Sequence, residues 1–269
     1  MVEIFDDIRK LYQFKLPCEE LKNHIEFFAE TCLEATHQHI TAEQFTVKLF
    51  PSYTPTIWIN FGPAYHLKNG EKWHTISHNT DILLLRNEIV ERRNRPSDNV
   101  LTVKFNPGGF EAIFGISQTR IASGIIHINE IIPDTVTRKV KRRQSFTDRV
   151  TLLQNYFLGA LKKTSRKDYH LQYVLNGIES FCSSGMEYGT AKIASKLCIT
   201  EKTFCRYFHS VVGTNPKHYL GIVRARTALT AYVRNRQDFL PYDYGYYDMS
   251  HFYRDAVKFT GQKITGNRF

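Results

Sequence analysis

The chain has 269 residues, of which 42% are hydrophobic and 13% aromatic, and its formal net charge is +10. This composition excludes an intrinsically disordered protein, and the length suits two globular domains. No apolar stretch approaches the roughly 18 residues that a membrane-spanning helix needs. The acidic start of the chain lacks the basic and then apolar pattern of a signal peptide, so we expect a cytoplasmic protein with no membrane partner.

The positive charge is concentrated in the second half of the sequence. Residues 1–150 contain 19 Lys and Arg against 18 Asp and Glu, whereas residues 151–269 contain 17 against 8. Such asymmetry is expected when one domain faces a polyanion. A solvated lysine-rich face or an attraction to anionic membranes gives the same imbalance, so the charge alone does not identify the partner.

Residues 1–137 are predicted to form a β-rich domain with some helix at its start. The expected strands are short apolar or alternating runs at Phe45–Leu49, Thr56–Phe61, Ile82–Leu85 and Leu101–Phe105. The sequence Asn106-Pro107-Gly108-Gly109 indicates a turn, and the apolar spacing in Phe110–Ile116 predicts a helix after it. Short strands separated by turn residues are typical of a sandwich or a small barrel.

Residues 138–185 are predicted to be a linker followed by helices. The run Arg138–Arg143 contains five cationic residues and is typical of a solvated linker or face. After it, Val150, Leu153, Phe157 and Leu161 form an apolar stripe at helical spacing. A second helix is expected from a cap at Asp168 through Cys182, ending at Ser184-Gly185.

Residues 186–269 carry the pattern of a DNA-binding domain. Thr190–Lys196 is a short helical pattern with the small residue Ala194 in its middle, and Thr200 is a good N-cap for the helix Glu201–His209. Two short helices, a tight turn and a small residue where the helices cross predict a helix-turn-helix. An ordinary pair of antiparallel helices with a charged outer face has the same local pattern.

The face of the second helix that points to solvent follows from its apolar face. Phe204 and Phe208 are four residues apart and point inward, which leaves Lys202, Cys205 and Arg206 outward in the first turns. In this motif those turns enter the major groove of DNA, where Lys and Arg suit the edges of guanine.

A long helix and a second unit follow. Asn215 caps and Pro216 begins a helix that is expected to reach about Asn235, or roughly 30 Å at 1.5 Å per residue. The first helix of the second unit is expected to be capped by Asp238, and its second helix by Asp248. The outward residues of that second helix are expected to be Met249, Ser250, Tyr253 and Arg254.

The ordered combination of these residues resembles a known family. Gly213-x-x-Pro216-x-x-Tyr219, then Arg224 and Ala228, then Gly245-Tyr246-Tyr247-Asp248-x-Ser250-His251-Phe252 is similar to the signature of AraC/XylS transcriptional regulators of bacteria. The resemblance covers nearly all of residues 186–261. It implies two helix-turn-helix units joined by a long helix, with the outward residues given above in contact with bases, and RNA polymerase as a partner if the protein is an activator.

The front half is similar to a poorly understood N-terminal domain that is fused to some AraC-type regulators. The resemblance rests on Ile57–Gly62 and on Val103–Phe110. It implies a cupin-like barrel that binds a small effector or pairs two copies of the chain. Trp58, Tyr65 and Trp73 are candidates to line a pocket there, although aromatic residues in strands more often belong to the core.

The sequence departs from the family pattern near its end. Pro241 replaces the small alanine expected in the first helix of the second unit. As the third residue of a helix capped by Asp238, Pro241 would lack only an N–H that has no partner within the helix. The spacing from Ala228 to Gly245 is about two residues tighter than usual, so the second unit is expected to bind DNA more weakly than the first.

Other chemistry receives less support from the sequence. The pairs His37-x-His39 and His74-x-x-x-His78 have spacings that suit a metal, but no further ligand is placed to complete either set. No nucleophile motif is present, so we expect no enzyme, no cofactor and no metal. The alternatives are a small-molecule-binding or cupin-type metalloprotein with a basic interaction module, and an interaction protein with a degenerate DNA-binding domain. The five cysteines, which include no C-x-x-C pair, are expected to be free thiols: Cys18, Cys32, Cys182, Cys198 and Cys205.

Overall fold

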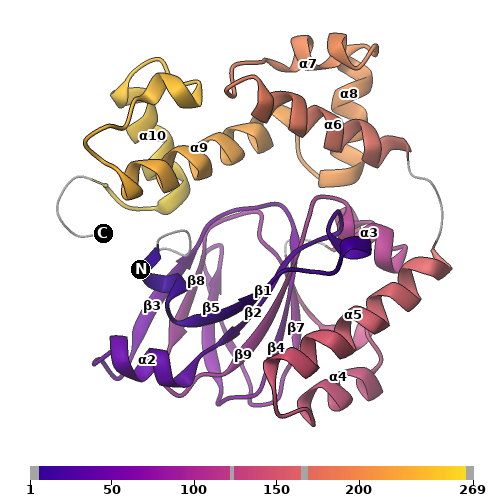
Figure 1. Ribbon diagram of the computed structural model, residues 1–269, viewed down its shortest axis with the longest axis vertical. Helices are drawn as coiled ribbons and strands as arrows, with labels where there is room; N and C mark the ends of the chain where they lie inside the picture. The colour runs from indigo at the N-terminus through magenta and orange to yellow at the C-terminus, as the bar shows by residue number, and fades with distance from the viewer. Residues whose placement is uncertain (1–5, 122–123, 165–168, 265–269) are drawn as a thin grey trace.

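The computed structural model describes residues 6–121, 124–164 and 169–264. Figure 1 shows a β-rich part in indigo and magenta, and above it a purely helical part in orange and yellow. The predicted class is confirmed: an α+β chain with a β-rich N-terminal domain, flanking helices and an all-α C-terminal domain.

The elements of the N-terminal part alternate short strands with a few helices. They are α1 (Asp6–Arg9), β1 (Tyr12–Lys15), η1 (Glu19–Leu21), β2 (Ile25–Thr31), α2 (Leu33–His39), β3 (Phe45–Leu49), β4 (Pro55–Asn60), β5 (Tyr65–Asn69), β6 (Lys72–Ile76), β7 (Ile82–Leu85), β8 (Val90–Asn94), β9 (Val100–Phe105), α3 (Gly109–Phe114), η2 (Gln118–Arg120), β10 (Ile125–His127), η3 (Ile128–Glu130), α4 (Asp134–Lys141) and α5 (Phe146–Lys163). The four predicted strands and the helix after the Asn106–Gly109 turn are confirmed to within a few residues.

The described strands form two antiparallel sheets that pack against each other. One sheet has the order β1-β2-β9-β4-β7-β10 and the other the order β3-β8-β5-β6. Every residue of β4 is buried, because Trp58 joins the core between the sheets while Ile57 and Ile59 join the core beneath the helices. Because both faces of β4 are buried, its sequence is a run of mostly apolar residues. A strand with one face in solvent would instead alternate apolar and polar residues.

Helices α3, α4 and α5 cover the outer face of the larger sheet, as Figure 1 shows for α4 and α5. Val140 of α4 and Leu153 and Phe157 of α5 are fully buried in one core with Phe105 of β9. The prediction of a linker at residues 138–143 is therefore wrong, since Val140 anchors α4 in the core and Lys141 pairs with Asp81 at 2.8 Å. The boundary between the two parts falls after α5.

The C-terminal part contains α6 (Tyr169–Ser183), α7 (Thr190–Lys196), α8 (Glu201–Val212), α9 (Pro216–Arg234), η4 (Pro241–Tyr244) and α10 (Met249–Thr260). The first of these helices packs with α7 and α8 around Phe204 and Phe208, so it belongs to this part. The predicted cap at Asp168 lies outside the described residues. The predicted caps of the later helices are confirmed, because the side chains of Thr200, Asn215 and Asp248 each accept a hydrogen bond from the backbone three residues on.

The first helix of the second unit differs from the prediction. Asp238 does not cap it; that carboxylate accepts a hydrogen bond from Asn235, at 2.7 Å. The element begins instead at Pro241 and is a 3-10 turn of four residues. A proline favours the first position of such an element, because it has no N–H to donate to a preceding turn.

The two parts touch through specific contacts. The buried side-chain amide of Gln118 donates to the carbonyls of Tyr53 and Val212, both at 2.8 Å, and so joins η2 to the end of α8. The turn before α3 also forms close contacts, because two of its residues are glycines without side chains. A side chain at Gly108, which has φ +69°, would come within 2.3 Å of Leu171 on α6, and one at Gly109 within 2.0 Å of a backbone oxygen on the N-terminal part.

Candidate DNA-binding surface and interdomain cavity

The first helix-turn-helix unit has the geometry that its sequence predicts. Ala194 is 1% exposed where α7 crosses α8, and a larger side chain there would push the helices apart. Cys198 takes a positive φ of 56° and so makes the tight turn between the two helices. Phe204 and Phe208 are fully buried and lie edge to face, at 5.6 Å between ring centres.

The predicted base-facing residues of α8 lie where solvent reaches them to different degrees. Lys202 and Arg206 are exposed, whereas Cys205 between them is half-buried. Burial, with a smaller contribution from Glu201, raises the pKa of the Cys205 thiol, so the group is neutral at physiological pH. The guanidinium of Arg206 lies 5.5 Å from the ring of Tyr207. The first unit thus presents two cations in the first turns of its second helix.

The predicted base-facing residues of α10 separate into two pairs. Ser250 and Arg254 are exposed. Met249 and Tyr253 are half-buried and pack against the core of this unit, and the Tyr253 hydroxyl lies 3.2 Å from that of Tyr232 on α9. The structure therefore gives the second unit a smaller solvent-facing surface than the sequence predicts.

A polar network that the sequence did not reveal fixes α10 against α9. The Arg224 guanidinium donates to the carbonyl of Gly245 and pairs with Asp255 at 3.5 Å, while the Tyr246 hydroxyl donates to Asp255 at 3.2 Å. Burial first, and then Asp255, raises the pKa of Tyr246 above its usual range. Arg224 and Tyr246 belong to the motif, but only the fold brings Asp255 to them.

The histidines do not assemble into a metal site within the part of the chain that the structure describes. No group of three potential ligands among His, Cys, Asp and Glu comes together there. His37 and His39 lie near the end of α2, and the ring of His78 contacts the carbonyl of Gly62 at 2.7 Å. His251 packs edge to face on Tyr246, at 5.0 Å between ring centres.

A cavity of about 130 Å³ lies between the N-terminal sheets and α9. Its floor and rim are largely apolar and aromatic, and include Trp58 from β4, Phe27 from β2, and Tyr12 and Phe14 from β1. Of the three aromatic residues considered from the sequence, only Trp58 lines this cavity. Tyr65 lies behind Trp58 in the core, and Trp73 is 41% exposed on β6.

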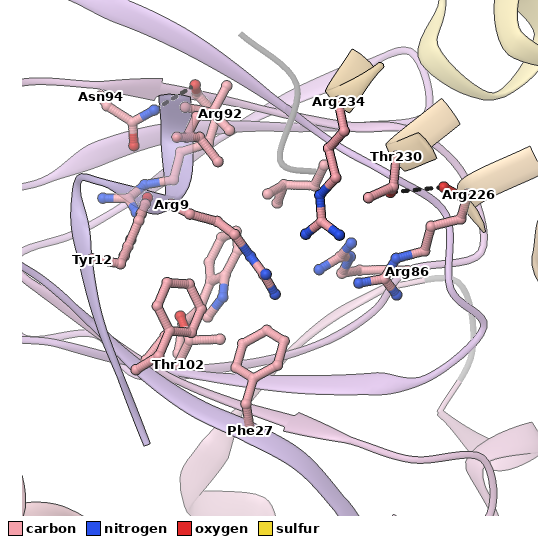
Figure 2. Close-up of a pocket in the computed structure, with 16 residues that line it drawn as sticks. Arg9, Tyr12, Phe27, Arg86, Arg92, Asn94, Thr102, Arg226, Thr230 and Arg234 are labelled. Atoms are coloured by element: carbon pink, nitrogen blue, oxygen red, sulfur yellow. Dashed lines mark hydrogen bonds between the residues drawn. The ribbon is translucent and has the colours of Figure 1, made fainter. Parts of the chain in front are cut away.

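Arginine is the principal charged residue of this cavity. The lining includes Arg9, Arg86, Arg92, Arg226 and Arg234, and among the lining residues none carries a carboxylate. Figure 2 shows the guanidinium groups of Arg86, Arg226 and Arg234 close together, with that of Arg9 directed toward the same space. Sequence reasoning did not identify this cluster, because its members are separated by more than two hundred residues.

Two of these arginines already have carboxylate partners outside the lining. Arg92 is 4% exposed and donates to Asp98 at 2.8 Å, with the Tyr65 ring 4.4 Å away. Arg226 of α9 donates to Glu26 of β2 at 3.3 Å. Arg86 is also buried, and it donates to the carbonyl of Phe50. Like charges held this close repel one another in a partly dry site, so an anion in the cavity would be stabilised.

Comparison with known proteins bears on the C-terminal part. A family described as a helix-turn-helix domain matches residues 193–267, and no curated protein matches the chain. None of the helices that the structure describes has the length and apolarity needed to cross a bilayer.

Solved structures that align with this chain do so at low identity and with TM-scores below 0.5. ToxT from Vibrio cholerae has a TM-score of 0.49 and 11% identity, with 95% of this chain and 97% of that chain covered. ToxT from strain SCE256 with a bound unsaturated fatty acid has a TM-score of 0.46 and 14% identity, with 82% and 92% covered. The AraC-like transcriptional activator CuxR has a TM-score of 0.30 and 9% identity, with 84% and 89% covered.

The family match spans the segment where the two pairs of helices, their caps and the long α9 were found. Residues 193–267 thus match a helix-turn-helix family, which agrees with the resemblance that the sequence predicted for this part of the chain.

Proposed function

We propose that the protein is a sequence-specific transcriptional regulator that reads duplex DNA through α8 and, more weakly, through α10. The observation that carries the proposal is the pair of exposed cations, Lys202 and Arg206, in the first turns of a capped helix within a helix-turn-helix unit. Arginine and lysine at such positions recognise guanine edges in the major groove. The proposal assigns no catalytic step to the chain.

The length of α9 supports reading by both units. This helix has 19 residues, or about 28 Å at ~1.5 Å per residue. One turn of B-DNA is about 34 Å, so units at the two ends of α9 would meet successive major-groove segments on one side of the duplex. If the protein is an activator, the bound regulator would also contact RNA polymerase.

The reading role is tested with Arg206→Ala. A cognate duplex is first selected from random sequences, and its affinity is then measured by fluorescence anisotropy alongside that of a scrambled duplex. We expect a loss of about 10- to 100-fold for the cognate duplex and little change for the scrambled one, because a bidentate contact to guanine discriminates by about 1–3 kcal/mol.

The matched control is Lys139→Ala, which removes one exposed cation from α4, outside the helix-turn-helix units. It should leave both affinities nearly unchanged. A small and equal loss for the two duplexes with Arg206→Ala would show that this residue only attracts phosphates, and would contradict base reading by α8.

We infer further that the cavity beside α9 binds an effector with an apolar body and one anionic group. The cluster of guanidinium groups supplies the anion site, and the aromatic lining supplies the apolar one. Its volume of about 130 Å³ is close to that of a cavity of ~150 Å³ that admits benzene. Benzoate, phenyl phosphate and benzyl alcohol are therefore suitable probes that share one body and differ in charge.

The two tryptophans of the chain make this binding measurable. Trp58 lines the cavity, so the variant Trp73→Phe leaves it as the single tryptophan, which can be excited selectively over the tyrosines. We expect benzoate or phenyl phosphate to change its fluorescence saturably, and Arg234→Ala to weaken that binding about fivefold or more, as loss of a charge-assisted hydrogen bond would. Benzyl alcohol should bind weakly, and with equal affinity to the proteins with and without Arg234→Ala. Equal binding of the alcohol and the anions would contradict an anion site.

A further inference from the structure

Glu26 of β2 lies between two cations from different parts of the fold. One carboxylate oxygen is 3.1 Å from the ammonium of Lys104 on β9, and the other is 3.3 Å from the guanidinium of Arg226 on α9. The Lys104 side chain is fully buried, whereas the side chains of Glu26 and Arg226 are each about one-third exposed. The carboxylate thus pairs with a buried, fixed cation in its own sheet and with a more exposed, movable cation on the helical part.

Arg226 lies at the boundary between separate hollows. It lines the arginine-rich cavity, where Figure 2 shows its guanidinium beside those of Arg86 and Arg234, and it also lines a second hollow whose wall includes Glu26. A flexible arginine at this boundary can direct its donors to the carboxylate on one side or to an anion on the other. The same donors cannot serve both equally well, because a guanidinium binds an anion best in a fixed fork geometry.

We propose that Glu26 is an internal competitor for the anion site, and that an effector binds by taking Arg226 from Glu26 while Lys104 keeps Glu26 neutralised. This inference rests on the effector cavity proposed above and names the residues that set its selectivity. Removing one partner of a partly buried ion pair is normally costly, since the other charge is left uncompensated. Here Lys104 stays in place, so the exchange leaves no carboxylate without a counter-ion.

The exchange connects the cavity to the DNA-reading units. Arg226 lies in the middle of α9, and α9 joins the first unit to the second. While Arg226 binds Glu26, α9 is tied to the sheet of the N-terminal part; once an anion holds Arg226, that tie is released. The effector must also outcompete a carboxylate, which favours anions that accept two hydrogen bonds from one guanidinium.

The test uses the full chain carrying Trp73→Phe, with benzoate as the probe and benzyl alcohol as its uncharged counterpart. In Glu26→Gln, the competing charge is gone, and we expect benzoate to bind about tenfold more tightly while the alcohol is unaffected. Glu19→Gln is the matched control, because Glu19 is an exposed carboxylate near the same sheet whose partner is Lys22. It should leave both affinities unchanged.

A second variant separates this exchange from damage to the fold. In Lys104→Met, Glu26 loses its buried cationic partner and should hold Arg226 more tightly, so benzoate should bind several-fold more weakly than in the parent protein. In the double variant, which combines Glu26→Gln with Lys104→Met, position 26 carries no charge, so the benzoate affinity should return to that of Glu26→Gln. Damage to the site would instead lower the affinity in both single variants.

The outcomes distinguish this inference from the effector proposal beneath it. If benzoate and phenyl phosphate bind neither the parent nor any variant, the effector cavity itself is wrong. If benzoate binds the parent but Glu26→Gln leaves its affinity unchanged or lower, the cavity stands and the competition is overturned.

Discussion

The two helix-turn-helix units of this chain are built from the same sequence plan but differ in how they fill their interiors. In the first, a seven-residue helix crosses α8 over the small side chain of Ala194, and two phenylalanines complete the core. In the second, the leading helix is reduced to the four residues of η4. The remaining volume is filled by aromatic rings from α9, η4, α10 and the loops between them, Phe239 and Tyr244 among them.

This difference affects which of the predicted base-facing residues are exposed. Around α8 the core needs no residue from the outer face, so Lys202 and Arg206 remain exposed. Around α10 the larger aromatic core also takes up Met249 and Tyr253. With a shorter leading helix, the second unit has less exposed surface on α10, because Met249 and Tyr253 supply part of the packing.

The largest effect is expected from overpacking the first unit. Ala194→Leu places three extra carbons where α7 crosses α8, and should destabilise this unit by about 1–3 kcal/mol and abolish sequence-specific binding. Pro241→Ala in the second unit removes part of a buried ring and should cost only about 1 kcal/mol, with weaker loss of specific binding. Urea unfolding and anisotropy with the cognate duplex measure both. Equal losses in the two variants would contradict the comparison.

A smaller effect is expected from Tyr253→Phe, which removes only the hydroxyl that bonds to Tyr232. The free energy of unfolding should fall by about 0.5–1.5 kcal/mol, and affinity for the cognate duplex should change less than about twofold. Tyr242→Phe is the control, because Tyr242 is 63% exposed. A specific loss of fivefold or more with Tyr253→Phe would restore this residue to the base-reading set that the sequence predicted.

The parts of the fold that the sequence predicted correctly depend on neighbouring residues. Alternating runs gave the strands, and Thr200, Asn215 and Asp248 were identified as caps because a cap bonds to the backbone three residues away. The turn before α3 was likewise encoded locally, in Asn106–Gly109.

The parts that were missed depend on residues far apart in the chain. The run at 138–143 was interpreted as a linker because of its cations, although Val140 within it anchors α4 to the sheet. Tyr253 is half-buried against the aromatic core of the second unit, although its helical position alone predicted a side chain directed outward. The cavity is lined by arginines from α1, from strands or loops of the two sheets, and from α9, and no local pattern marks such a convergence.

The paired glycines before α3 have a wider consequence. Position 108 faces α6 and α8, while position 109 presses on the backbone beside His24, so adjacent residues abut opposite halves of the molecule. The distance between the two parts at this point is therefore set by the glycine backbone alone, with no side chain between them. A single methyl group added at either position would clash with this backbone or side chain and shift the helical part relative to the β-rich part; if the proposed DNA-binding role is correct, this shift would also change how the two units meet the duplex.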